Sequence, residues 1–207
     1  MSKGFRVASW VVGITTVVLC DALFVSMVAL LFLEDASFDA PTSSVTVGAA
    51  VSDFLLEQVV SVLWMVLPVL LLASVILGIV AAASKYPDAL VTTRAIMLLY
   101  KLGLIPFFIA GGFDEVILII AGFHPVLVGF GWILAIICGV MGWCVMFSGS
   151  MWAIATAIHL KRQRRISGGE LAAHIILQLI FVADVIDGII LFVRSKRLPS
   201  ADPQSFA

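Results

Sequence analysis

Charged residues are scarce in this chain. Only 12% of its 207 residues are Asp, Glu, Lys or Arg, whereas hydrophobic residues make up 62%. Soluble domains carry roughly 25% charged and 45–50% apolar residues, so this composition is that of a chain surrounded by lipid. The chain also has no room for a separate soluble catalytic domain beside several membrane spans. We therefore expect one all-α membrane domain over residues 1–197 and a short polar tail over residues 198–207.

Catalytic and metal-binding motifs are absent as well. The sequence contains no HExxH, no GxSxG, no Gly-rich phosphate loop and no CxxC. Zinc proteases, serine hydrolases and nucleotide-driven enzymes therefore lack the residues that their chemistry needs. We expect no enzymatic activity, no cofactor, no metal and no nucleic-acid partner.

What the chain does have is long apolar runs. A helix of about 20 residues crosses a hydrocarbon core of roughly 30 Å, and four runs are long enough to do so. The third of them should end at Gly111-Gly112, and the short run at residues 114–122 should form a re-entrant or interfacial helix. The four runs are residues 5–33, 54–83, 91–110 and 126–160.

The C-terminal run is ambiguous. Residues 171–193 form an apolar-dominated stretch of the length of one bilayer crossing, which favours a fifth transmembrane helix. Its four polar side chains favour the alternative, four spans plus a re-entrant or interfacial C-terminal helix. These side chains are His174, Gln178, Asp184 and Asp187.

Charge segregation predicts the orientation. Segments rich in Lys and Arg lie on the cytoplasmic side, and they are the N-terminus with Lys3 and Arg6, the group of Lys85, Arg94 and Lys101, and residues 161–165. The acidic residues at positions 34–53 and 114–115 then lie outside the cell membrane. A fifth span would break this rule, because Arg194, Lys196 and Arg197 would face outward.

Small residues repeat every four positions in two of the predicted helices. Such ladders let two helix backbones approach closely, so we expect them to be buried helix contacts, with residues 126–160 at the centre of the bundle. The ladders are Ser74/Gly78/Ala82, Gly131/Ala135/Gly139 and Gly149/Ala153/Ala157.

Three aspartates inside apolar runs are the first candidates for function. A carboxylate within hydrocarbon costs a few kcal/mol or more unless it is paired or protonated, and it often marks an ion or proton path. Asp21 has a structural alternative, a hydrogen bond to Thr15, Ser26 or Lys101. Asp184 and Asp187 lie three residues apart and so share a helix face, where they hold a proton or a cation or simply meet water near Gly188.

Two further groups complete the candidates. His174 and Gln178 are four residues apart and form one polar stripe, which is either functional or satisfied by backbone contacts. The cluster of Lys161, Arg162, Arg164 and Arg165 is either a topology anchor or a binding site for anionic lipid head groups. Lys101 is the cation available for helix pairing inside the bundle.

Two segments carry a family resemblance: residues 101–108 (KLGLIPFF) and residues 177–186 (LQLIFVADVI). The region from about residue 94 to 197 resembles small, functionally uncharacterised bacterial multi-span membrane proteins. This resemblance implies a multi-pass protein of the bacterial inner membrane. It also implies that Lys101, Pro106, Gln178 and Asp184 are family features, and it implies no activity.

Two functions remain open. The first is an accessory or interaction subunit of a transport-related membrane complex, with lipids and a protein partner or a second copy around it. The second is a small proton- or cation-coupled carrier or channel that uses the intramembrane aspartates.

Overall fold

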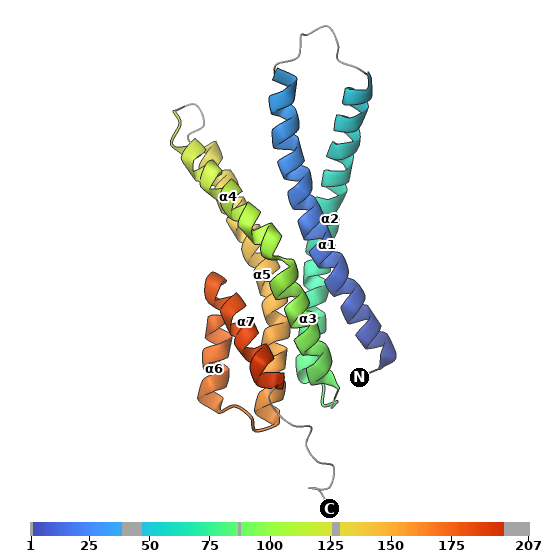
Figure 1. Cartoon of the computed structure of the whole chain (residues 1–207), viewed down its shortest axis with the longest axis vertical. Helices are drawn as coiled ribbons and strands as arrows, with labels where there is room; N and C mark the ends of the chain where they lie inside the picture. The colour runs from blue at the N-terminus through green and yellow to red at the C-terminus, as the bar shows by residue number, and fades with distance from the viewer. Residues whose placement is uncertain (1, 39–46, 87, 126–128, 197–207) are drawn as a thin grey trace, which may run out of the picture.

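The chain is a bundle of seven helices within residues 2–38, 47–86, 88–125 and 129–196, which are those that the computed structural model describes. Four stretches are long and apolar enough to cross a membrane: Lys3–Leu23, Trp64–Ala83, Ala89–Gly122 and Phe130–Arg162. The all-α prediction is confirmed. In Figure 1 the helices are α1 (Lys3–Phe38), α2 (Val47–Ala83), α3 (Ala89–Gly103), α4 (Ile105–Gly122), α5 (Phe130–Arg162), α6 (Gly168–Leu177) and α7 (Phe181–Lys196).

The third apolar stretch is a broken helix. It is interrupted at Leu104 and restarts at once as α4, with Pro106 in the first turn, where its missing N–H is no loss. The chain then stays helical through Gly111 and Gly112, because glycine is tolerated in apolar helices. The predicted end at these glycines and the separate short helix at residues 114–122 are therefore wrong. Asp114 and Glu115 lie inside α4 rather than in a loop.

The C-terminal run differs from the prediction of a single helix. Residues 171–193 form two helices, α6 of 10 residues and α7 of 16, each too short to cross about 30 Å. Figure 1 shows α6 rising beside α5 and turning about halfway along it, after which α7 returns to the end where α6 began. Neither a single spanning helix nor a single re-entrant or interfacial helix describes this hairpin of two helices.

The open end of the hairpin is tied by Glu170. Its carboxylate accepts hydrogen bonds from the Ser167 backbone N–H at 2.7 Å and from the Arg194 guanidinium at 2.7 Å, which together lower the pKa of Glu170 to about 2. The Ser167 hydroxyl caps α6 in return. This contact holds the end of α7, with Arg194 and Lys196, near the beginning of α6.

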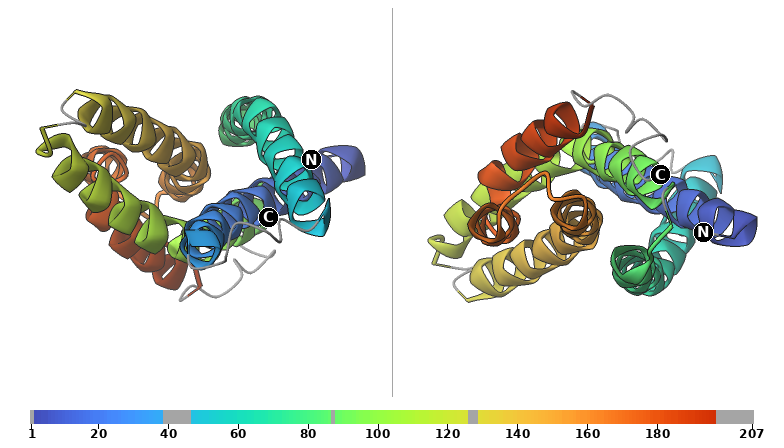
Figure 2. Two further views of the ribbon diagram at one scale, coloured as in Figure 1. Left: turned by 90° about the horizontal axis from the view of Figure 1, so that it is seen from above. Right: turned by 90° about the horizontal axis from the view of Figure 1, so that it is seen from below.

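Helix α5 is the packing centre, as predicted, although it begins at Phe130. Seen along the bundle, α3 and α5 lie between the hairpin and the α1–α2 pair (Figure 2). A Cβ added at Gly131 would lie 2.6 Å from the Gly122 backbone nitrogen in α4, and one at Gly149 would lie 3.0 Å from Tyr100 Cβ in α3. One at Gly78 would lie 2.9 Å from Met151 Cβ in α5. The small-residue ladders are thus helix contacts.

We predict that Gly131→Leu lowers the free energy of unfolding by about 1–3 kcal/mol, because backbone atoms of α4 cannot yield to the added side chain. Gly142→Leu is the matched control on the same helix, since a Cβ there meets nothing within 4 Å. Thermal unfolding in detergent measures both. Equal melting temperatures for Gly131→Leu and the parent would show that α4 does not pack on this ladder.

Candidate functional site

A buried ion pair joins α3 to α7. The ammonium of Lys101 contacts the Asp184 carboxylate, and both side chains are almost fully buried. The Ser150 hydroxyl of α5 lies 2.8 Å from Asp184 Oδ1 and accepts from Lys101 at 3.3 Å. Gly188 gives the lysine stem its space, because a Cβ there would lie 3.1 Å from Lys101 Cγ. Three helices therefore meet at this contact.

A second carboxylate lies on the same face of α7. Asp187 Oδ1 is 2.5 Å from His174 Nδ1, and Asp187 Oδ2 accepts from Gln178 Nε2 at 2.6 Å. Both partners come from α6, so the four-residue stripe predicted there faces the aspartates of α7. The aspartates are 2% and 0% exposed, which rules out the alternative that they meet water near Gly188.

These contacts form one unit, which we call the buried charge cluster. It brings together five of the six predicted candidates, with Ser150 added by the structure. It lies beside the break between α3 and α4 and under the tip of the hairpin. Its members are Lys101, Ser150, His174, Gln178, Asp184 and Asp187.

The cluster contains more acids than permanent cations. Lys101 pairs with one of the two carboxylates, and the other, that of Asp187, has the His174 ring and the Gln178 amide as its neighbours. An uncompensated charge in a low-dielectric interior costs several kcal/mol, so each carboxylate depends on these partners. Within the described residues no three His, Cys, Asp or Glu side chains are placed to hold a metal ion.

One acceptor in the cluster is unfilled. Gln178 Oε1 is buried and has no hydrogen-bond donor among the described residues, while its amide nitrogen donates to Asp187. Such an orphaned acceptor is costly, because it has lost its hydrogen bonds with water without replacing them. It lies at the end of α6, where the hairpin turns, and offers a place for one more proton-bearing group.

Asp21 lies apart from the cluster. The Phe107 backbone N–H in the first turn of α4 donates to its carboxylate, so Asp21 caps the helix that restarts after the break. Of the predicted partners, Lys101 pairs with Asp184 instead, and the side chain of Ser26 lies outside the part of the chain that the structure describes. Asp21 Oδ1 is buried without a partner among the described residues.

Several polar contacts were not foreseen from the sequence. Tyr100 Oη and Trp152 Nε1 both donate to the Ser74 hydroxyl, at 2.7 Å and 3.0 Å, and so join α2, α3 and α5. Buried Tyr and Trp seek such partners, but nothing in the sequence shows which serine supplies the acceptor. Apart from its small size, nothing in the sequence indicates that Ser150 belongs to the site.

The predicted basic cluster begins in the last turn of α5, continues into the loop that follows, and is mostly solvent-exposed. Arg162 donates to the Ser84 carbonyl at 2.7 Å and joins the ends of α5 and α2. Arg164 adopts a positive φ of 55°, where the chain turns toward α6. Lys161 and Arg164 are exposed, and Arg165 is half-buried.

Comparison with known proteins gives a family but no activity. Residues 10–197 match the family described as "Family of unknown function (DUF6652)". This confirms the predicted membership of a functionally uncharacterised family. Neither a curated protein nor a solved structure matches the chain.

We predict that Lys101→Met and Asp184→Leu each cost about 3–5 kcal/mol of stability, because each leaves one buried charge uncompensated. The double variant should lose less than the sum of the two, which a double-mutant cycle of thermal unfolding measures. Arg194→Met is the control: it breaks the exposed pair with Glu170, with side chains 45% and 41% exposed, and should leave the melting temperature close to that of the parent. Additive losses at Lys101 and Asp184 would contradict the pairing.

Proposed function

We propose, for a chain that belongs to a family of unknown function, a multi-pass membrane protein that carries protons through its buried charge cluster. The supporting observation is the meeting of that cluster with a broken helix and a re-entrant hairpin. Irregular backbone inside a membrane is tolerated where it is buried in protein, and transporters place their binding sites at such discontinuous helices.

The proposed topology has four spans, α1, α2, α3–α4 and α5, with α6–α7 entering and leaving on the cytoplasmic side of a bacterial inner membrane. The described Lys and Arg residues other than Lys101 then face the cytoplasm, in agreement with the positive-inside rule. Figure 1 supports this arrangement, because α1 begins and α2, α5 and α7 end at the same end of the bundle.

Labelling tests the topology. In a variant without Cys20, Cys138 and Cys144, we introduce Ser43→Cys, Ser167→Cys or Ser200→Cys one at a time. An impermeant thiol reagent applied to intact cells should label only Ser43→Cys, while all three react after the cells are opened. Labelling of Ser200→Cys from outside would restore the fifth span, and labelling of Ser167→Cys would invert the whole orientation.

The proton is the favoured cargo because the cluster contains two neighbouring side chains of types that accept and release protons. Asp187 and His174 share one hydrogen bond, and both are buried. The other charged groups beside them are Lys101 on α3 and Asp184 on α7, which pair with each other. The Asp187–His174 pair is therefore the place in the cluster where we propose that a proton is carried.

We predict that Asp187→Asn and His174→Gln each reduce proton flux at least tenfold, since neither replacement can accept and release a proton. Purified protein in liposomes with a pH gradient and an internal pH-sensitive dye gives the flux, and thermal unfolding is measured on the same samples. Asp21→Asn is the control: its amide oxygen can still accept from the Phe107 N–H of α4, and it lies outside the cluster, so its flux should stay at the wild-type level.

A specific observation also supports the second function, an accessory subunit of a membrane complex. The outer halves of α4 and α5 contact each other, and their remaining faces carry exposed large apolar side chains, such as Phe113, Ile120, Phe130, Ile133 and Ile136. These faces suit a helix of a partner protein or lipid. Two results together would favour this function over the carrier: the wild-type protein shows no proton flux under any gradient, and a stoichiometric partner copurifies with it from native membrane.

A further inference from the structure

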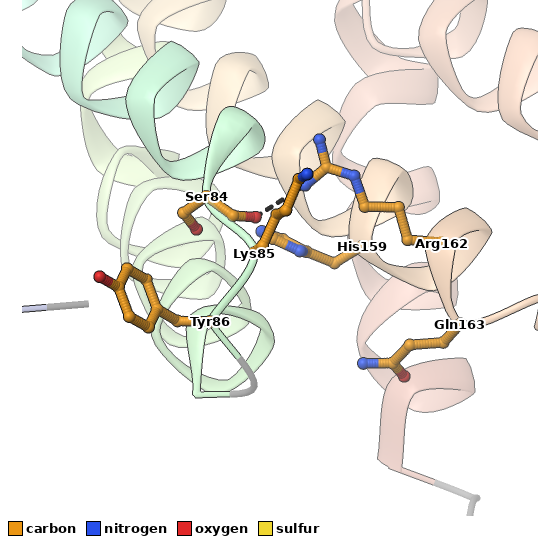
Figure 3. A pocket seen from close by; sticks show the side chains of 6 residues that line it. All are labelled: Ser84, Lys85, Tyr86, His159, Arg162 and Gln163. Atoms are coloured by element: carbon orange, nitrogen blue, oxygen red, sulfur yellow. Dashed lines mark hydrogen bonds between the residues drawn. The ribbon is translucent and has the colours of Figure 1, made fainter.

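A pocket of about 260 Å³ lies between the cytoplasmic ends of α2 and α5. It is separate from the buried charge cluster and has no part in the proposed proton path. Figure 3 shows Lys85 and Arg162 extending from these two helix ends toward the same part of the pocket. The lining residues are Ser84, Lys85, Tyr86, His159, Arg162 and Gln163.

Much of the donor capacity of this pocket is unused. Lys85 has no hydrogen bond or ion pair with any described residue. Arg162 donates one N–H to the Ser84 carbonyl at 2.7 Å. This bond fixes the guanidinium and leaves its other N–H donors for a ligand. His159, which is 5% exposed, bonds the Ala81 carbonyl at 3.0 Å and forms the inner wall.

None of the described residues that line the pocket carries a carboxylate. Two cations that point into one partly enclosed space repel each other, and the repulsion is relieved by an anion between them. The planar guanidinium of Arg162 suits phosphate oxygens, and the Lys85 ammonium adds a movable second charge. We propose that this pocket binds the phosphate group of an anionic membrane lipid, held between Lys85 and Arg162.

Size and position select this ligand. The volume exceeds that of a single water, about 30 Å³, several-fold, but it falls below the roughly 300–1,000 Å³ of pockets that enclose whole small molecules. It therefore fits a phosphate with part of a head group rather than an entire nucleotide. In the proposed topology it lies where head-group phosphates of the cytoplasmic leaflet lie, and basic pockets between helices on that side bind such groups.

Lipid titration of the purified, delipidated protein, read by native mass spectrometry, tests the proposal. Wild type should bind phosphatidylglycerol more tightly than phosphatidylcholine. Lys85→Gln should weaken phosphatidylglycerol binding about fivefold, the effect of one basic residue at an anionic surface. This variant breaks no contact of Lys85 with the described residues, so its fold should persist. Arg164→Gln, in the neighbouring basic loop but outside the pocket, is the matched control and should bind as wild type.

Three outcomes would overturn the proposal. Equal binding of the two lipids by wild type would remove the need for an anion. Loss of binding in Arg164→Gln but not in Lys85→Gln would move the site to the loop at residues 161–165. The third outcome concerns inorganic phosphate. If it raises the melting temperature of the wild type but not of Lys85→Gln, while phosphatidylglycerol does not bind, the ligand is phosphate from solution and not a lipid of the bilayer.

Discussion

The ion pair between Lys101 and Asp184 is the contact on which the arrangement of the C-terminal third depends. A lysine buried in an apolar helix bundle needs an anion, and α7 supplies it from the first turn after the hairpin tip. The polar side chains of the hairpin are accordingly turned inward: Asp184 contacts Lys101 of α3 and Ser150 of α5, and Asp187 contacts His174 and Gln178. Ile176, Ile180 and Val182 are exposed instead. Without these charges, the hairpin would lose the contacts that hold it against α3 and α5.

The residues of the site could be predicted, but their meeting could not. Charges within apolar runs are conspicuous because their burial is costly, and helical periodicity correctly put Asp184 with Asp187 and His174 with Gln178. The turn between these stripes, at residues 178–180, contains neither glycine nor proline, and the apolar run continues through it. Contacts of Asp187 with His174 and Gln178 hold the two sides of this turn together. Such contacts between separate helices are not predicted by the pattern of apolar residues along the sequence.

The broken helix was missed for a different reason. Gly103 and Pro106 indicate a break in the helix, but the length of the apolar run favours one continuous helix. Gly111-Gly112 is the stronger signal for the end of a helix. Gly103 instead serves a close approach, since a Cβ there would lie 2.7 Å from Val17 Cγ1 in α1. The ladders were predicted well, because their spacing expresses the same requirement directly in the sequence.

The two residues of the buried ion pair are synthesised at different times, because they lie far apart in the chain. Lys101 and Asp184 are 83 residues apart, and α4, α5 and α6 lie between the helices that carry them. Lys101 is therefore synthesised well before its counter-ion, and it stays unpaired while these three helices are added. The ion pair forms only when α7 has been synthesised. A product that stops before α7 therefore leaves Lys101 without the carboxylate that neutralises it.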